Sequence, residues 1–193
     1  MRKLISSTFL SVDGLMAGPN NEMDWFMDTF TPEMGVEFSR AQATQDTFLL
    51  GETTYNIFAK YWPFQPDSNL GAKHINHCKK YVVSRNLKEA PWGDLEPATI
   101  INGDLEGEVK KIKALAGGDI VVPGSGSIVQ QLTNLGLIDE YQIILEPVVL
   151  GGGKPLFENI NQRLDLKLVR SVPFKNNAIA LYYQPVTKGE ENG

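Results

Sequence analysis

The chain has 193 residues and a formal net charge of −5, with 42% hydrophobic and 21% charged residues. This length and composition predict one globular domain with a substantial core. The negative charge, without a cluster of lysines or arginines, argues against nucleic acid or a membrane surface as a partner. The single cysteine excludes an internal disulfide bond.

The N-terminal segment MRKLISSTFLSVDGLMAG is interrupted by serine, threonine and aspartate, so we interpret it as a strand over 3–12 and not as a signal peptide. No run approaches the ~18 apolar residues of a membrane-spanning helix. We therefore expect a cytoplasmic protein. A loop rich in glycine, proline and asparagine, AGPNNEMDW, follows the strand.

Helices and strands then alternate, and the chain ends in strands alone. Thr31 as N-cap and Pro32 at the first helical position predict a helix over 31–45. The other helices are expected over 52–62, 104–118 and 127–136, and the strands over 46–51, 79–84, 98–101, 119–124, 139–151, 164–174 and 178–186. Residues 67–78 are expected to form a loop with a short helix.

This order predicts a three-layer α/β/α sandwich with a mostly parallel mixed sheet and a C-terminal antiparallel hairpin. The asparagines in Lys175-Asn176-Asn177 favour the hairpin turn. We expect a single domain over 1–187 and a disordered tail over 188–193.

Three corners that follow strands are candidates for holding a ligand. IVVPGSGSIVQQ runs from a strand into a helix through glycines that leave backbone N–H groups accessible, which favours a phosphate group. LLGETTY and VVSRN place small polar residues and Arg85 at two more strand ends. Each corner alone is also compatible with a capped helix or a solvated turn, but together they predict a groove long enough for a dinucleotide.

His74, His77 and Cys78 form the pattern H-x-x-H-C. This pattern is compatible with a metal site, but a polar helix end or loop explains it better, and we predict no metal.

The motifs SVDGLMAG, LLGETTY, YVVSRN, IVVPGSGSIVQQL and GLIDEYQIILEPVVLGGGKPLF resemble the dihydrofolate reductase-like superfamily. The last motif is most similar to the reductase domain of the bacterial riboflavin-biosynthesis deaminase/reductase. The resemblance spans about residues 2–186, and the zinc-binding pattern of the deaminase domain is absent. It implies an oxidoreductase that uses NADPH.

By position, the resemblance places Met16 and Ala17 against the nicotinamide and the loop over 18–25 as a lid. It assigns the pyrophosphate and the adenosine end to the corners, namely Gly51, Glu52, Thr53, Thr54, Ser84, Arg85, Asn86, Pro123, Gly124, Ser125, Gly126, Ser127 and Ile128.

Glu52 departs from the family, which usually has arginine or lysine at that position to bind the 2′-phosphate of NADPH. A carboxylate there suits the free ribose hydroxyl of NADH, so NADH is an alternative cofactor. Equally, Glu52 is compatible with a side chain in solvent at a helix start.

The substrate end has no diagnostic motif, and no catalytic triad is expected because the cofactor supplies the hydride. Glu37 lies near the place where dihydrofolate reductases carry an acidic residue, and Asp24 and Trp25 end the predicted lid. Each also fits a structural role. The catalytic residues are not assigned.

Three functions follow from the resemblance. The first is an NAD(P)H-dependent reductase of a small heterocycle, most like 5-amino-6-(5-phosphoribosylamino)uracil reductase of riboflavin biosynthesis. The others are a dihydrofolate reductase and a non-catalytic nucleotide-binding module. The family's typical assembly implies a homodimer, with the C-terminal hairpin, which contains the apolar run AIALYY, as a possible dimer edge.

Overall fold

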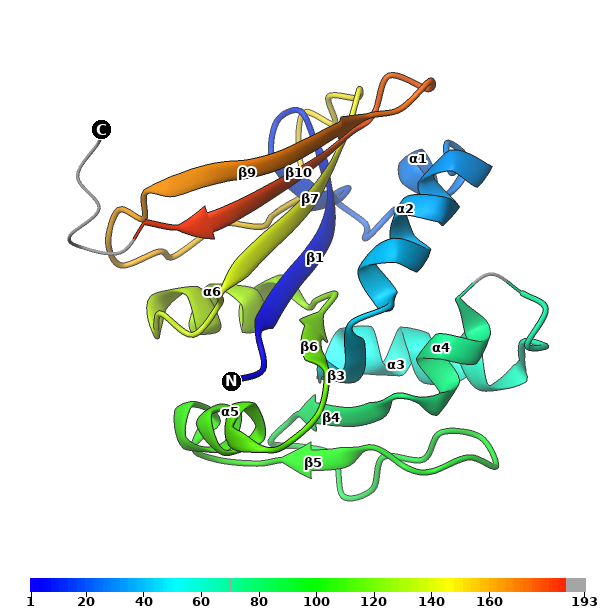
Figure 1. The fold of residues 1–193 in the computed structure, drawn as a ribbon, viewed down its shortest axis with the longest axis vertical. Coiled ribbons are helices and arrows are strands. Elements are labelled where there is room, and N and C mark those ends of the chain that lie inside the picture. The colour runs from blue at the N-terminus through cyan, green and yellow to red at the C-terminus, as the bar shows by residue number, and fades with distance from the viewer. Residues whose placement is uncertain (70, 187–193) are drawn as a thin grey trace.

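An eight-stranded sheet in the order β5-β4-β3-β6-β1-β7-β10-β9 runs through the computed structural model, which describes residues 1–69 and 71–186 (Figure 1). The predicted tail over 188–193 lies outside the described residues. The strands are β1 (Leu4–Ser11), β3 (Gln45–Gly51), β4 (Lys79–Val83), β5 (Thr99–Ile101), β6 (Asp119–Val122), β7 (Glu140–Glu146), β9 (Leu166–Pro173) and β10 (Ile179–Pro185). A second, two-stranded sheet pairs β2 (Leu15–Ala17) with β8 (Lys154–Pro155).

The six neighbouring strands β5, β4, β3, β6, β1 and β7 are parallel to one another. Strand β10 is antiparallel to both of its neighbours, β7 and β9. Asn177 takes a positive φ of 67° in the turn between β9 and β10. The mostly parallel sheet with a C-terminal antiparallel hairpin is therefore confirmed.

Helices cover both faces of the sheet, which confirms the three-layer sandwich (Figure 1). Helices α5 (Leu105–Ala114) and α6 (Gly126–Asn134) pack on one face against Leu4, Ile120 and Ile143. On the other face, Met34 of α2 (Pro32–Gln42) packs against Ile144, while α3 (Glu52–Tyr61) and α4 (Ala72–His77) cover β3 and β4. A 3₁₀ turn, η1 (Trp62–Phe64), ends α3.

The predicted cap of α2 is confirmed, because the Thr31 side chain accepts a hydrogen bond from the Met34 N–H at 3.3 Å. The predicted strand over 139–151 is too long. It ends at Glu146, because Pro147 has no N–H with which to continue the ladder.

The loop predicted over 17–25 leads into a short helix, α1 (Asp24–Met27). The ring of Phe26 in this helix stacks on Phe9 of β1, with centroids 4.3 Å apart. Burial of this ring against the sheet explains why the segment leaves the loop conformation.

Within the described ranges, no helix is both long and apolar enough to cross a membrane. The same residues contain no group of three or more potential metal ligands. In the H-x-x-H-C segment, the His74 ring lies 3.5 Å from the Cys78 sulfur, whereas His77 contacts the Lys73 carbonyl.

Candidate nucleotide-binding groove

The central sheet is open on one side of β1. Strand β6 pairs with β1 only from Leu4 to Ser6 and ends at Val122. Residues 7–11 of β1 therefore pair with β7 alone, and their other edge lies free at the carboxyl ends of the parallel strands. Open α/β sheets bind their ligands at this end.

Two helices begin beside this opening. Gly51, at the end of β3, donates its N–H to the Gly124 carbonyl at 3.0 Å and joins the two corners. A Cβ atom on Gly51 would lie 2.0 Å from Ser125 Oγ, so the close approach of the corners requires glycine. The Gly124-Ser125 peptide bond is cis. The hydrogen bond between Gly51 and Gly124 brings the N-termini of α3 and α6 close together.

Neither of these N-termini is capped by a side chain. Gly51 has no side chain to offer, and the Ser125 side chain makes no cap hydrogen bond. By contrast, Thr31 caps α2 and Asp104 caps α5. The N–H groups of both first turns are thus left without a side-chain acceptor, and the two helix dipoles place positive potential there. This arrangement fits a pyrophosphate group.

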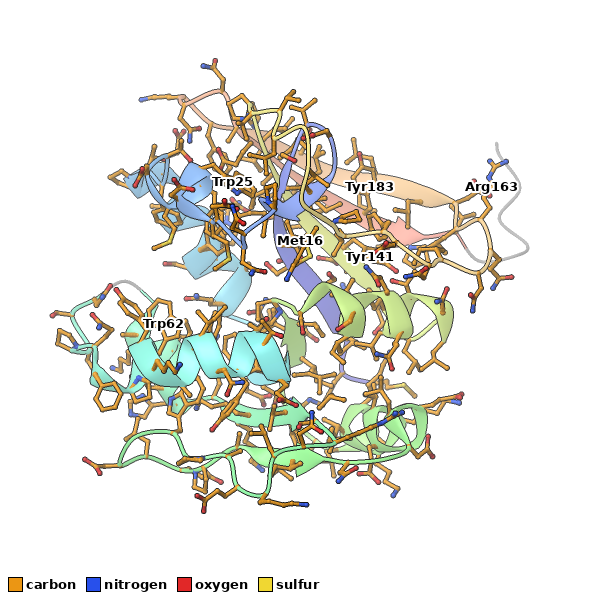
Figure 2. All side chains as sticks on the ribbon, turned by 180° about the vertical axis from the view of Figure 1, so that it is seen from behind. Met16, Trp25, Trp62, Tyr141, Arg163 and Tyr183 are labelled. Carbon is orange, nitrogen blue, oxygen red and sulfur yellow. The ribbon has the colours of Figure 1, made fainter. Side chains whose placement is uncertain are left out.

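Met16 lies at the opening, as Figure 2 shows near the centre of the molecule. Its sulfur is 3.0 Å from the position that a Cβ on Gly126 would occupy, and its methyl carbon is 3.7 Å from the corresponding position on Gly124. The pairing of β2 with β8 holds Met16 and the buried Ala17 in place. The absence of side chains on Gly124 and Gly126 therefore allows Met16 to pack closely against the corner.

The loop with three glycines after β7 packs onto the segment from Asp13 to Gly18. Asp13 accepts hydrogen bonds from the N–H groups of Leu150, at 3.1 Å, and Gly151, at 2.8 Å. A Cβ on Gly153 would lie 2.1 Å from the Ala17 carbonyl oxygen. The GGG motif therefore shapes the groove by close backbone packing.

The far end of the groove contains Glu52. Its carboxylate accepts hydrogen bonds from Ser84 Oγ at 2.6 Å and from Asn86 Nδ2 at 3.4 Å. Glu52 is therefore turned toward the end of β4 and not into solvent. Arg85 and Thr53 are exposed and Thr54 is half-buried, with its Oγ1 2.8 Å from the Cβ position of Gly124.

Among the predicted substrate residues, Trp25 is half-buried and donates its indole N–H to the Glu22 carbonyl at 3.2 Å. Asp24 is exposed. Contact of these two residues with a substrate stays a prediction.

Glu37 has a different environment from the one expected. Arg170 on β9 donates to both of its carboxylate oxygens, and the hydroxyl of Tyr182 on β10 donates to one of them. The hydrogen bond from Arg170, with smaller help from Tyr182, outweighs burial and lowers the pKa of Glu37 below its ordinary value. Glu37 therefore joins α2 to the sheet as an ionised group and is a poor proton donor.

The sequence analysis missed Glu146, the last residue of β7, which is 1% exposed. The available signal was a single carboxylate in the apolar run IILEPVV. Its pairing partner in register is Ser11, the last residue of β1. Glu146 thus lies one strand away from the open edge of β1, at the carboxyl end of the sheet.

Comparison with known proteins identifies the family. The sequence profile of the RibD C-terminal domain matches residues 2–180. The chain belongs to the RibD C-terminal domain family. The uncharacterized protein YyaP of Bacillus subtilis strain 168 is 35% identical to this chain over 186 residues, which cover 94% of each protein.

Solved structures share the fold of this RibD C-terminal domain protein. A candidate riboflavin biosynthesis protein from Shewanella sp. PV-4 has a TM-score of 0.79 at 22% identity, with 96% of this chain and 99% of that one covered. Dihydrofolate reductase from Enterococcus faecalis, in complex with NADP(H), has a TM-score of 0.62 at 14% identity over 95% and 96% of the two chains.

The third structure is a two-activity protein from Thermotoga maritima, a diaminohydroxyphosphoribosylaminopyrimidine deaminase/5-amino-6-(5-phosphoribosylamino)uracil reductase. Its TM-score is 0.69 at 11% identity, and the match covers 96% of this chain but 57% of that protein. The dihydrofolate reductase-like fold expected from the motifs is confirmed.

Proposed function

We propose that this RibD C-terminal domain protein is an NAD(P)H-dependent reductase that transfers a hydride to a small heterocyclic substrate. The named activity that it resembles most is 5-amino-6-(5-phosphoribosylamino)uracil reductase. The observation that carries the proposal is the convergence of two uncapped helix N-termini on an opening in the sheet. The reductase named for the Thermotoga maritima protein and the NADP(H) of the Enterococcus faecalis enzyme support it.

The residues of the groove divide the work of binding. The first turns of α3 and α6, from Gly51 and Ser125 onward, would hold the pyrophosphate with backbone N–H groups. Met16, beside the glycine corner, would support the nicotinamide ring. When bound, a reduced nicotinamide supplies a hydride from its C4 atom. The chain's part is to position the acceptor and exclude water.

The reaction is tested by following loss of the reduced nicotinamide absorbance with the riboflavin-pathway pyrimidine and with dihydrofolate as separate acceptors. The proposal expects oxidation of the cofactor that depends on one of these heterocycles. Tight cofactor binding without turnover on either acceptor would instead favour a non-catalytic module.

Glu52 is expected to set the choice between NADPH and NADH. We propose NADPH as the cofactor, with discrimination against NADH weakened by this carboxylate. Because a 2′-phosphate placed near Ser84 and Asn86 would face a fixed negative charge, Glu52→Gln should improve NADPH affinity about 5- to 10-fold, which corresponds to ~1 kcal/mol of relieved repulsion. NADH affinity should not improve, because its ribose carries a neutral hydroxyl at this position.

Fluorescence titration of the wild type and the Glu52→Gln variant with both cofactors measures the ratio of NADPH affinity to NADH affinity. Glu106→Gln on α5 is a suitable control, since it removes a partly exposed carboxylate from a different helix start. If the Glu52→Gln variant keeps the wild-type ratio of affinities, Glu52 does not determine the preference between NADPH and NADH.

We also propose that the protein is a homodimer. Strand β9 is the edge of the large sheet, and Leu168 and Val169 on it are 48% and 46% exposed. An exposed apolar edge strand favours pairing with a second copy. Light scattering should give twice the chain mass of 21.4 kDa, and Val169→Lys should shift the protein to monomer. A wild-type monomer would contradict the assembly but not the groove.

A further inference from the structure

Two buried side-chain atoms lack a hydrogen-bond partner within residues 1–69 and 71–186, namely Thr8 Oγ1 and Glu146 Oε1. Thr8 lies on β1, which borders the open edge, and Glu146 lies on β7, which pairs with the other side of β1. Native proteins leave few such atoms unpaired, because a buried polar atom without a partner costs roughly 1–3 kcal/mol. An unpaired atom beside a binding groove therefore points to a ligand.

The two atoms lie on opposite faces of the sheet. Thr8 is in register with Ile143, whose face carries α6 and Met16, the residue at the proposed cofactor site. Glu146 alternates with Leu145 and shares the face of Ile144, which packs against Met34 of α2. The face of the sheet that carries Met16 and the face that carries Glu146 thus both adjoin the opening.

Glu146 is enclosed by the segment between α1 and α2. Its Oε2 accepts a hydrogen bond from Thr29 Oγ1 at 3.1 Å, and the side chain is 1% exposed. Asp24 on α1 and Asp28 in the segment after it are exposed, and Glu33 on α2 accepts a hydrogen bond from the Lys175 N–H. Burial raises the pKa of Glu146, the Thr29 hydrogen bond opposes this weakly, and no charged group contributes to the shift.

Resting on the reductase function above, we propose that Glu146 is the acid that protonates the substrate, and that the substrate is a heterocycle with a ring nitrogen beside an amino group. Such an edge pairs with the carboxyl through two hydrogen bonds, one at the unpaired Oε1. Two steps across the sheet separate β6 from β7, or ~10 Å, a span suited to a nicotinamide and a neighbouring heterocycle.

The proton balance of the reduction is complete with this residue. A bound reduced nicotinamide would supply a hydride to the carbon of a C=N bond in the substrate ring. The π electron pair would move to that ring nitrogen, which would take the proton from Glu146. The carboxylate that remains is reprotonated by water when product leaves.

The first test is the pH dependence of stability in Glu146→Gln. Because the raised pKa keeps the folded chain protonated when the unfolded chain has ionised, the wild type should lose stability as pH rises above the ordinary glutamate value of 4.5. The glutamine in the Glu146→Gln variant cannot ionise. The melting temperature of the variant should therefore exceed that of the wild type at about pH 8 and match it at about pH 4. Asp28→Asn, at an exposed neighbour, should follow wild type throughout.

The second test uses 2,4-diaminopyrimidine as the probe, with calorimetry for affinity and ultraviolet absorbance for its protonation. Wild type should bind the probe as the cation at a pH where the free probe is neutral. Glu146→Gln should bind it at least roughly tenfold more weakly and without the cation spectrum, while Asp28→Asn should behave as wild type.

A Glu146→Gln variant that binds the protonated probe as well as wild type would overturn the proposal, and so would a wild type that binds no probe. Titration with NADPH and NADH on the same samples separates the two claims. Probe binding that depends on Glu146, without binding of either cofactor, would contradict the proposed reductase function. It would still support Glu146 as the acid of a heterocycle-binding site.

Discussion

Replacing Gly124 by alanine is expected to weaken NADPH binding about 100-fold, equivalent to ~2.7 kcal/mol. Gly124 has a φ of +148°, and a Cβ there would lie 2.8 Å from Thr54 Oγ1 and 3.7 Å from the methyl carbon of Met16. The added atom would strain the corner and separate the first turns of α3 and α6. The pyrophosphate would then lose its backbone donors.

Gly136→Ala is the matched control for this substitution. Gly136 also has a positive φ, +64°, but a Cβ there meets no atom within 4 Å. It should cost ~1 kcal/mol of stability through backbone strain and leave cofactor affinity unchanged. Fluorescence titration of the two variants separates the site effect from the backbone effect. Equal affinities in both variants would show that the glycine corner does not hold the cofactor.

Replacing Arg170 by methionine should lower the free energy of unfolding by ~2 kcal/mol at neutral pH. The change leaves the buried carboxylate of Glu37 with the Tyr182 hydroxyl as its remaining donor. Loss of a fully buried partner costs ~3–5 kcal/mol, but the Arg170 side chain is 36% exposed, so water screens part of the effect. Urea denaturation of the wild type and the variant measures the difference.

The pH dependence of this loss has a defined sign. The pKa of Glu37 is lowered in the fold, so its contribution is present above its ordinary value of 4.5 and disappears as pH falls through the folded value. The destabilisation by Arg170→Met should therefore shrink in acid. Arg163→Met is the control, because that side chain is 86% exposed in its pair with Asp165 and should contribute less than ~0.5 kcal/mol. Equal losses in the two variants would contradict the buried ion pair.

The layers of this fold could be predicted from the sequence because the signals are local. Thr31 and Pro32 mark a helix start, the apolar runs mark parallel strands, and Asn177 marks the hairpin turn. The glycine corners were found for the same reason. Gly51 is the last residue of one buried strand, and Gly124 follows the end of another after Pro123.

The chemistry of the carboxylates could not be predicted in this way. Glu37 lies on a helix where a solvent-exposed or substrate-facing side chain is expected, but its partner Arg170 is 133 residues away. Glu146 looks like the exposed end of a strand in the sequence, but the structure buries it and gives it a hydrogen bond from Thr29, 117 residues away. Both outcomes depend on packing between distant segments, which leaves no periodic signal in the sequence.

The most direct test of the central claim is a fluorescence titration of the wild-type protein with NADPH and with NADH. The account predicts saturable binding of a reduced nicotinamide dinucleotide at one site per chain, weakened about 100-fold in Gly124→Ala and unchanged in Gly136→Ala. Absence of binding to both cofactors would contradict the account and leave the uncapped starts of α3 and α6 as structural corners of the fold.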